Sequence, residues 1–428
     1  MSLGFSHSLM LAVYGAAWRI ARPFLDRNKR LKHGLSQRLV PSGWSKRAHV
    51  WIQAASGGEA FLAWQMLREM PDDTQMTILL TSCTKQGVEV LEKAQKWAAD
   101  EKSYLDVIVT YFPYDQPKTM QRAVEMVSPK VMVLLETEVW PSLMTACTER
   151  NIPVALLNAR MNPRSLAGYL LISGFLRRIR PTMIHAISEE DALRYAALFG
   201  AKGVHTMCNI KFDSVAAVRA KGKNPLEGTV VKKNSPLIVL GSVREEEEID
   251  VLKLIEKLKT ARPKTSIALF PRHMERIGAW QMMLEGAQLP VVIRSQITEP
   301  PAPGSIILWD TFGELGHAYQ LARAVFVGGS LAPLGGQNFL EPLSFGKTPV
   351  IGPSFYNFKW TKGVIDEGMV YSMQNADEVY EQIMRILKRP AKPEATQKKF
   401  SAWLTKCQGG TAQAVKTILM LKKQGDTT

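Results

Sequence analysis

At 428 residues the chain is too long for one ordinary hydrophobic core, so its length predicts two domains of about 200 residues each. Its 46% hydrophobic and 22% charged content excludes an intrinsically disordered chain, and four scattered cysteines without a C-x-x-C pair argue against a disulfide framework or a zinc site. The net charge of +15 predicts an anionic partner: a membrane surface, a phosphorylated substrate or nucleic acid.

The N-terminal segment, residues 1–40, has the pattern of a membrane-associated helix. Residues 8–18 are apolar, but Arg19 and Arg22 end the run well short of the roughly 20 residues that a spanning helix needs. No basic residue precedes the run, as one would in a secretory signal, whereas several follow it. This order predicts a helix that lies in the inner face of a membrane, with its basic side on anionic headgroups. The alternative is a helix packed on the protein's own surface.

Beyond residue 44 the sequence alternates short apolar runs with amphipathic stretches. Continuous apolar strands separated by helices are typical of parallel sheets that are covered on both faces. Two such series predict two doubly wound α/β domains. The first series of strands is 49–54, 76–81, 105–111, 130–135, 152–157 and 183–187, with helices at 59–70 and 86–99; the second series is 237–240, 266–270, 290–293, 305–309, 324–327 and 348–351.

The predicted domain boundaries follow from composition. Residues 216–235 are polar and contain several glycines and prolines, which is typical of a linker. This linker separates an N-terminal Rossmann-like domain at 41–215 from a C-terminal Rossmann-like domain at 236–390. Residues 391–428 have helical periodicity and are predicted to form a helical tail that packs back on the body.

The stretch 324–349 combines a predicted strand, two glycine pairs and a short helix. The strand breaks at Gly328-Gly329, the chain turns again at Gly335-Gly336, and the helix begins near Asn338. A glycine turn before a helix N-terminus points free N–H groups at one place, which favours phosphate binding. Glu341 would repel a phosphate, so its expected role is to accept hydrogen bonds from a ribose diol. The alternative is an ordinary strand-turn-helix with a solvated glutamate.

Polar clusters directly follow most of the predicted strands. In open α/β sheets, ligands bind beyond the carboxyl ends of the strands, so we expect the clusters of the two domains to face one central cleft. In the first domain they are Gln53 to Glu59, Thr81-Ser82, Pro113 to Asp115, Glu136-Thr-Glu138 and Asn158-Ala-Arg160; in the second they are Ser242-Val-Arg244, Pro271-Arg272-His273 and Asp310 to Glu314.

Seven motifs distributed along the chain carry a family resemblance. They are W-I-Q-A-A-S-G-G-E (51–59), L-E-T-E-V-W-P-S-L (135–143), N-A-R-M-N-P-R-S (158–165), N-I-K-F-D (209–213), F-P-R-H-M-E-R (270–276), D-T-F-G-E-L (310–315) and F-V-G-G-S-L…G-G-Q-N-F-L-E-P (326–342). Together they resemble the signature blocks of 3-deoxy-D-manno-octulosonic acid (Kdo) transferases, in the order of that family. The resemblance implies a GT-B glycosyltransferase on the cytoplasmic side of the inner membrane, held there peripherally or by a single N-terminal anchor. Such an enzyme transfers Kdo from CMP-Kdo to a lipid A precursor and inverts the anomeric centre.

The resemblance implies roles for three residues of the first domain. A hydroxyl acceptor loses its proton as it attacks, so an inverting single displacement needs one base. Glu59 matches the family's base, although a glutamate at a helix N-terminus is otherwise more often a stabilising charge. Glu136 and Lys211 match the positions that the family assigns to transition-state stabilisation. From the residue type alone, Lys211 would be a solvated loop lysine.

The donor contacts implied by the resemblance lie in the second domain. Cations and N–H dipoles aimed at the departing phosphate stabilise its growing charge, and Arg272 is a candidate, although alone it would more often form a surface salt bridge. Glu136-Thr-Glu138 could be an acidic metal pair, but a monophosphate leaving group has no diphosphate for a metal to bridge. We therefore expect no metal, and no cofactor beyond the donor CMP-Kdo. The implied CMP contacts are Pro271, Arg272, Phe312, Gly313, Glu314, Asn338, Phe339, Leu340 and Glu341.

The chain departs from the family pattern at several places, none of which removes a residue with an implied catalytic role. Gln337 and Val243-Arg244 lie on the donor side, so one alternative is another GT-B transferase or epimerase that uses a different nucleotide sugar. A nucleic-acid binder is suggested by charge alone and lacks any RNA-binding or zinc-finger signature, so the expected partners are CMP-Kdo, a lipid A precursor and an anionic membrane surface. The departures are Gln53 for His, Gly57 for Val, Cys208 for Gly, Val243-Arg244 for Thr-His and Gln337 for His.

Overall fold

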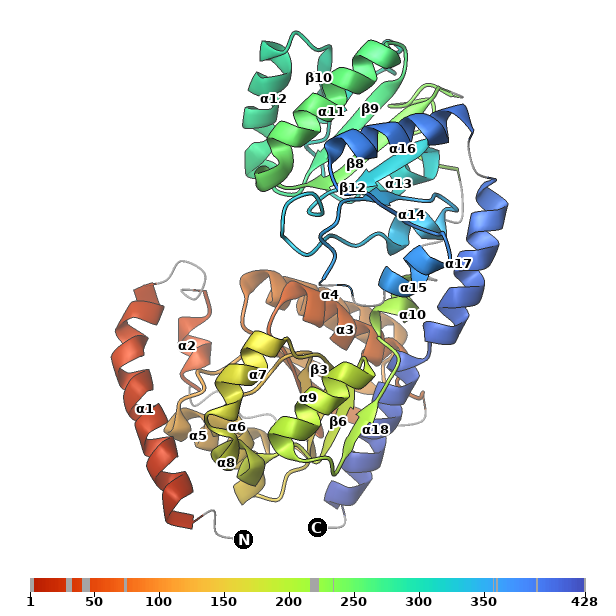
Figure 1. Ribbon diagram of the computed structural model, residues 1–428. Coiled ribbons are helices and arrows are strands. Elements are labelled where there is room, and N and C mark those ends of the chain that lie inside the picture. The colour runs from red at the N-terminus through yellow and green to blue at the C-terminus, as the bar shows by residue number, and fades with distance from the viewer. Residues whose placement is uncertain are drawn as a thin grey trace. The chain divides into compact units, whose positions relative to one another are not determined.

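The computed structural model describes residues 4–27, 33–40, 47–72, 75–215, 223–233, 235–356, 358, 361–389 and 392–426. The chain divides into two compact units, each built around one seven-stranded parallel sheet (Figure 1). The first domain contains Met1–Ser214 and Cys407–Thr428, and the second contains Val215–Lys406. The prediction of two doubly wound parallel-sheet domains is confirmed. Residues 216–222 and 234 of the predicted linker lie outside the described residues.

The strands of the first domain form a single parallel sheet. They are β1 (Val50–Ala54), β2 (Met76–Ser82), β3 (Leu105–Tyr111), β4 (Val131–Leu135), β5 (Val154–Ala159), β6 (Met183–Ala186) and β7 (Val204–Thr206). Their order in the sheet is β3-β2-β1-β4-β5-β6-β7. Every residue of β1 is buried, with Val50 and Ile52 in the core on one face and Trp51 in the core on the other. A strand that is buried on both faces requires the continuous apolar run that the sequence contains.

Helices cover both faces of this sheet. The face of Val50 is covered by α3 (Gly57–Arg68), α4 (Lys85–Glu101) and α18 (Gly410–Asp426). The face of Trp51 is covered by α5 (Pro117–Val127), α6 (Pro141–Glu149), α8 (Ser173–Leu176) and α9 (Glu189–Phe199). The remaining α-helices described in this domain are α1 (Gly4–Arg27), α2 (Leu35–Arg38), α7 (Pro163–Leu170) and α10 (Lys211–Val215).

Strands β1 and β4 are neighbours at the centre of the sheet although two strands separate them in the sequence. The chain progresses outward from β1 to β3 on one side and from β4 to β7 on the other. This reversal is a topological switch point, where open α/β sheets bind ligands beyond the carboxyl ends of the strands. Glu59 follows β1 and Glu136 follows β4, so both residues lie at the switch point.

Helix α1 packs one of its faces on the first domain. The Tyr14 hydroxyl donates a hydrogen bond of 3.0 Å to Asp115, and the His7 ring stacks on Phe175 with centroids 4.4 Å apart. One face of α1 therefore packs on the protein's own surface, as the alternative interpretation expected. Within the described ranges, no helix combines the length and apolar character needed to cross a bilayer. Lys29, Arg30 and Lys32 of the predicted basic segment lie outside those ranges.

The C-terminal residues, predicted as one helical tail at 391–428, form two helices that are grouped with different domains. Most of α17 (Pro393–Cys407) belongs to the second domain, whereas α18 returns to the core of the first (Figure 1). The Asp213 carboxylate accepts hydrogen bonds from the N–H groups of Gly409 (2.7 Å) and Thr411 (2.6 Å). These bonds satisfy donors at the start of α18 and hold the helix on the first domain.

The second domain repeats the same architecture. Its strands are β8 (Leu237–Val243), β9 (Ser266–Pro271), β10 (Val291–Ile293), β11 (Ile306–Leu308), β12 (Ala324–Val327), β13 (Val350–Ile351) and β14 (Tyr371–Ser372). Their order is β10-β11-β9-β8-β12-β13-β14, so the switch point lies between β8 and β12. One face is covered by α11 (Glu248–Ala261), α12 (Ile277–Gly286) and α16 (Ala376–Lys388). The domain also contains α13 (Leu315–Leu321), α14 (Leu340–Ser344) and α15 (Thr361–Asp366).

Two strands extend beyond their predicted ends for the same reason. β5 continues to Ala159 and β8 to Val243, and each contains a residue with a left-handed backbone, Asn158 (φ 53°) and Ser242 (φ 57°). The pairing register shifts at both places. Such an irregularity redirects the side chains that follow it, here at the carboxyl edge of each sheet. β7 and β14 were not predicted, because they are too short to give a recognisable apolar run.

Candidate functional site

Glu59 is the third residue of α3 and closes the N-terminus of that helix. Ser56 accepts a hydrogen bond from the Glu59 N–H (3.3 Å), and the Glu59 carboxylate accepts one of 2.5 Å from the Ala55 N–H. These two bonds resemble a capping box, so Glu59 does stabilise the N-terminus of α3, as the alternative interpretation expected. The side chain is nonetheless buried, and burial, followed by the charge of Glu136, raises its pKa above the ordinary value. A buried carboxylate with a raised pKa is a stronger proton acceptor than an exposed one.

Glu136 lies directly after β4 and has a left-handed backbone, with φ 54°. Its N–H donates to the Leu157 carbonyl (3.0 Å), and its own carbonyl accepts from the Tyr195 hydroxyl (3.1 Å), which fixes this unusual conformation. The carboxylate is paired with two cations, Lys211 Nζ at 2.6 Å and Arg160 Nη2 at 2.7 Å. The structure thus brings together Glu136 and Lys211, which come from separate motifs.

Lys211 is placed by the turn that precedes α10. Asn209 accepts a hydrogen bond from the Lys211 N–H, and Asn158 accepts one from the Ile210 N–H, each at 3.0 Å. The side chain is half-exposed and reaches the buried Glu136. The reading of Lys211 as a solvated loop lysine is therefore wrong.

Glu138 is a third buried carboxyl group at the same edge. Gln53 Nε2 (3.3 Å) and Trp140 Nε1 donate hydrogen bonds to it, and the Thr81 hydroxyl donates to Gln53 Oε1 (2.6 Å). Burial, followed by the charge of Glu59, raises the pKa of Glu138 to about 8. No role was predicted for Glu138, because the sequence does not show that Gln53 occupies the neighbouring strand and contacts it. In the part of the chain that the structure describes, no group of three or more His, Cys, Asp or Glu side chains is arranged to hold a metal.

In the second domain, the turn after β12 contacts a carboxylate of the same chain. The N–H groups of Gly329, Ser330 and Leu331 all donate to Glu247, as does the Arg244 N–H (3.0 Å). The expectation that this glycine turn offers free N–H groups to a phosphate is therefore wrong for these three donors. Glu247 ends the segment after β8, so the bonds join the two strands at the switch point. The run Glu245 to Glu248 is the sequence signal for such an acceptor.

The short helix α14 begins at Leu340, after Asn338. Asn338 Oδ1 accepts a hydrogen bond from the Leu340 N–H (3.1 Å), in the manner of a helix cap. Glu341 is largely buried, and a Cβ added to Gly316 at the start of α13 would lie 2.3 Å from its Oε1. Burial raises the pKa of Glu341, so the alternative of a solvated glutamate is wrong.

The other predicted donor residues lie at the carboxyl edge of the same sheet. Pro271 ends β9, and the N–H of Arg272 donates to the Val243 carbonyl (2.7 Å), while the Arg272 side chain is exposed. Phe312 is 84% exposed, and Gly313 has φ 84°, a conformation that favours glycine.

Glu314 holds the turn that carries Phe312 and Gly313. Arg294 donates two hydrogen bonds to its carboxylate (3.0 and 2.8 Å), and Trp309 and Thr311 donate one each. Partial burial alone would raise the pKa of Glu314, but these donors lower it below the ordinary value. The hydrogen bonds of Glu314 therefore hold this turn in place, while the Phe312 side chain is exposed to solvent.

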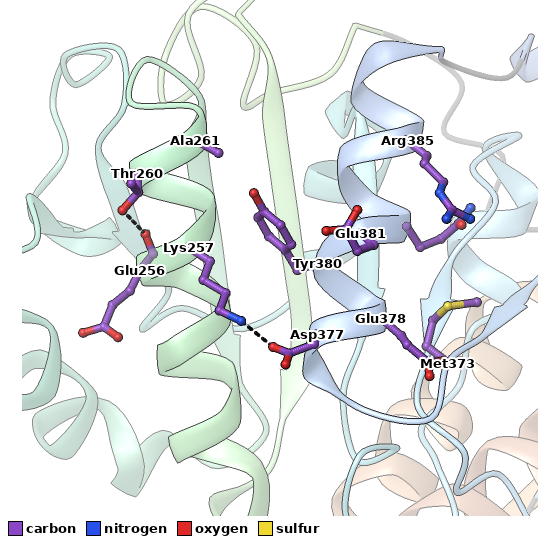
Figure 2. A pocket seen from close by; sticks show the side chains of 11 residues that line it. Glu256, Lys257, Thr260, Ala261, Met373, Asp377, Glu378, Tyr380, Glu381 and Arg385 are labelled. Carbon is purple, nitrogen blue, oxygen red and sulfur yellow. Dashed lines mark hydrogen bonds and ion pairs between the residues drawn. The ribbon is translucent and has the colours of Figure 1, made fainter.

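A groove of about 900 Å³ lies elsewhere in the second domain, between α11 and α16 (Figure 2). Lys257 of α11 and Asp377 of α16 form an ion pair of 2.5 Å across it. The groove contains none of the predicted site residues, so volume alone does not identify the site in this domain.

Comparison with known proteins identifies a family. Residues 29–214 match the family model described as 3-deoxy-D-manno-octulosonic-acid transferase (kdotransferase). A 3-deoxy-D-manno-octulosonic acid transferase from Haemophilus influenzae is 32% identical over 72% of this chain and 71% of its own length, and one from Bordetella pertussis is 28% identical over 87% of each. A glycosyltransferase structure from Rickettsia africae covers 88% of this chain and 98% of its own, with a TM-score of 0.59 and 12% identity. That likeness shows a common two-domain glycosyltransferase fold.

Proposed function

The chain belongs to the Kdo transferase family and is a glycosyltransferase, and we propose that it transfers Kdo from CMP-Kdo to a lipid A precursor with inversion. The observation that carries this proposal is the group of two buried carboxylates and a half-exposed lysine at the switch point of the first domain. Glu59, Glu136 and Lys211 lie there together, and the charge of Glu136 acts on Glu59. This is the arrangement that activation of a hydroxyl acceptor requires.

In this proposal Glu59 is the general base. The acceptor hydroxyl forms a bond to the anomeric carbon of Kdo, the bond from that carbon to the CMP phosphate oxygen breaks, and the hydroxyl proton passes to Glu59. The raised pKa of Glu59 supports this role, because a base whose pKa lies nearer to the working pH takes up a proton more readily. The hydrogen bond that the Ala55 N–H donates to the carboxylate fixes the direction of the side chain.

Lys211 and Glu136 act as a pair on the transition state. The Lys211 side chain is 42% exposed, so its positive charge is available to stabilise the leaving phosphate as that group gains charge. Glu136 holds the ammonium group in position through the bond of 2.6 Å. Because its ammonium group is already held, the Lys211 side chain loses little further conformational freedom when the donor binds.

The nucleotide is held by the second domain. Arg272 is exposed at the carboxyl edge of the sheet and is proposed to pair with the CMP phosphate. Phe312, on the turn with Gly313 and Glu314, offers a ring for stacking on the base, and the segment of Asn338, Phe339, Leu340 and Glu341 is proposed to contact the ribose. Because the leaving group is a monophosphate, we propose that transfer needs no metal. The rate is then unchanged by EDTA.

We propose that α1 associates with the cytoplasmic face of the inner membrane. Val13, Ile20 and Phe24 are 64%, 72% and 69% exposed, on a helix whose other side is docked through Tyr14. An exposed apolar face followed by basic residues fits a helix that lies in the headgroup region of an anionic membrane. This position would bring the enzyme to a lipid acceptor.

The test is incubation with CMP-Kdo and a tetra-acylated lipid A precursor, followed by mass spectrometry of the lipid. A product heavier by one or more Kdo residues, with release of CMP, is expected. An unmodified lipid, with consumption of a diphosphonucleotide sugar instead, would establish the alternative of another GT-B transferase or epimerase.

A further inference from the structure

Two cations at the switch point of the first domain share one buried carboxylate. Glu136 is 4% exposed in its side chain, whereas Arg160 and Lys211 are each 42% exposed. Glu136 can balance only one of the two positive charges. When Glu59 has taken up a proton, the group of Glu59, Glu136, Arg160 and Lys211 therefore has a net positive charge, and part of it faces solvent.

Arg160 and its neighbour Asn158 have hydrogen-bond donors to spare. Within the described residues, Arg160 Nε and Asn158 Nδ2 are buried and have no hydrogen-bond partner. Asn158 is fully buried, and its Oδ1 is used by the Ile210 N–H beside Lys211. A guanidinium group has five N–H donors in a planar fork, and buried donors in proteins are almost always satisfied. Because these two atoms are buried, it is the exposed remainder of the Arg160 guanidinium group, together with Lys211, that can meet a negatively charged acceptor from outside the chain.

The backbone that carries Arg160 is held rigidly. Glu136 and Asn158 both have φ above 50°, a conformation that costs about 1 kcal/mol or more for residues other than glycine. The Arg160 N–H donates to the Glu136 carbonyl (3.2 Å), and the Tyr195 hydroxyl donates to the carbonyls of Glu136 and Arg160. Strained residues that their surroundings hold in place are frequent at ligand sites.

We propose that Arg160, with Lys211, binds the carboxylate of the transferred sugar acid. The inference rests on the proposed function. In a 2-ulosonic acid the carboxylate is bonded directly to the anomeric carbon, so its binding site must lie beside the general base. Glu59 follows β1 and Glu136 follows the adjacent strand β4, and Arg160 pairs with Glu136 at 2.7 Å, so the two cations lie at the same edge of the sheet as the base. A phosphate group of the lipid acceptor is the other anion that could reach these cations.

Arg160 is then a residue that determines specificity. Without its charge, only Lys211 would offset the repulsion between the sugar carboxylate and the carboxylates of Glu59 and Glu136. A neutral sugar would leave the Arg160 fork without its acceptor, so the site distinguishes an acidic sugar from a neutral one. This accounts for Arg160, the first of the two arginines of the motif 158–165, to which no role was assigned from the sequence.

The experiment compares Arg160→Gln, Arg160→Lys and the control Arg164→Gln, a change at an exposed arginine on α7. Dissociation constants are measured for CMP and for CMP-Kdo, and KM is measured for CMP-Kdo and for the lipid acceptor. Because CMP lacks the sugar, Arg160→Gln is expected to leave CMP affinity unchanged and to weaken CMP-Kdo binding by roughly tenfold or more. Arg160→Lys keeps the charge but loses the fork, so an intermediate effect is expected. The acceptor KM and the control stay at wild-type values.

Three results would overturn the inference. The first is CMP-Kdo binding by both Arg160 variants at the wild-type level, and the second is a rise in the acceptor KM alone, which would assign the cations to an acceptor phosphate. The third is an equal loss of CMP and CMP-Kdo affinity. If Arg160→Gln has a melting temperature far below that of the wild type, the inference is judged on the CMP and CMP-Kdo affinities of Arg160→Lys, because that variant retains the ion pair with Glu136. Failure of the wild-type chain itself to transfer Kdo would instead refute the proposed function.

Discussion

Lys211 and Glu136 form an ion pair with a distance of 2.6 Å, although 75 residues separate them in the sequence. Glu136 directly follows β4, and Lys211 begins α10 after the last strand of the same sheet. The parallel order of the sheet brings both to one carboxyl edge, next to Glu59 after β1. The buried carboxylate of Glu136 therefore lies at the same edge as the proposed base, Glu59, and pairs with two cations, Lys211 and Arg160.

As the pH is lowered, the activity is expected to begin to fall at a higher pH than it would with an ordinary glutamate as the base. Glu59 must lose its proton before it can act as a base, and burial and the charge of Glu136 raise its pKa. The acid limb of the kcat/KM profile therefore lies above the pH range of an exposed glutamate. In Glu136→Gln one cause of the raised pKa of Glu59 is removed, so the acid limb moves to lower pH, whatever the loss in maximal rate. An acid limb that stays in place or moves to higher pH would contradict this account.

The stability of the protein is expected to fall as the pH rises toward 8. The native state keeps a proton on Glu138 up to about pH 8, whereas the unfolded chain releases it near the ordinary value of 4.5. The unfolded state thus binds fewer protons between these values, so the free energy of unfolding decreases with pH in that window. Glu138→Gln should remove this contribution, which at about 1.4 kcal/mol per pKa unit is on the order of 4–5 kcal/mol. Melting temperatures from pH 5 to pH 8.5 check it against the exposed control Glu69→Gln, and identical slopes would refute it.

Glu247 is expected to support donor binding by holding the turn after β12. Removal of its carboxylate in Glu247→Ala leaves four backbone N–H donors without an acceptor and should cost about 2–3 kcal/mol of stability. The same turn leads to the segment around Asn338, so CMP affinity should fall roughly tenfold. Calorimetry with CMP tests this, with Glu246→Gln as an exposed neighbouring control. A destabilised variant that binds CMP normally would show that the turn does not serve the donor site.

The exposed face of α1 is expected to bind anionic vesicles. Replacing Val13, Ile20 and Phe24 by serine removes apolar surface worth about 1.5–3 kcal/mol per residue if fully inserted, so sedimentation with vesicles should fall at least tenfold. Deletion of residues 1–30 should have the same effect, but it also removes the contact of Tyr14 with Asp115. A serine at the equally exposed Ile249 of the second domain is the control. Undiminished sedimentation of the triple variant would contradict membrane association through α1.

The sequence predicted the two sheets and nearly all of their strands, because central parallel strands must be continuously apolar. It could not predict what depends on the local path of the backbone. The left-handed residues Asn158 and Ser242, and the turn at Glu136, are not visible in composition or periodicity. The return of α18 to the first domain depends on Asp213, a residue nearly 200 positions earlier in the chain.

The sequence likewise predicted some residues of the candidate site and missed others. The resemblance of the motifs to the Kdo transferases identified Glu59, Glu136 and Lys211 as candidates, and they lie at one edge of the sheet. The partners Arg160, Gln53 and Glu138 had no assigned role, because contacts across strands leave no signal in a single sequence. The glycine turn at 328–331 has the composition of a phosphate loop, and only the position of Glu247 reveals that its donors are occupied.

The most direct test is Kdo transfer by the wild-type chain and by Glu59→Gln, followed by mass spectrometry of the lipid product at matched saturation with CMP-Kdo. The account predicts that Glu59→Gln binds CMP-Kdo like the wild type but forms product at least roughly a hundredfold more slowly, while Glu69→Gln keeps the full rate. Product formation by Glu59→Gln at a rate near that of the wild type would contradict it.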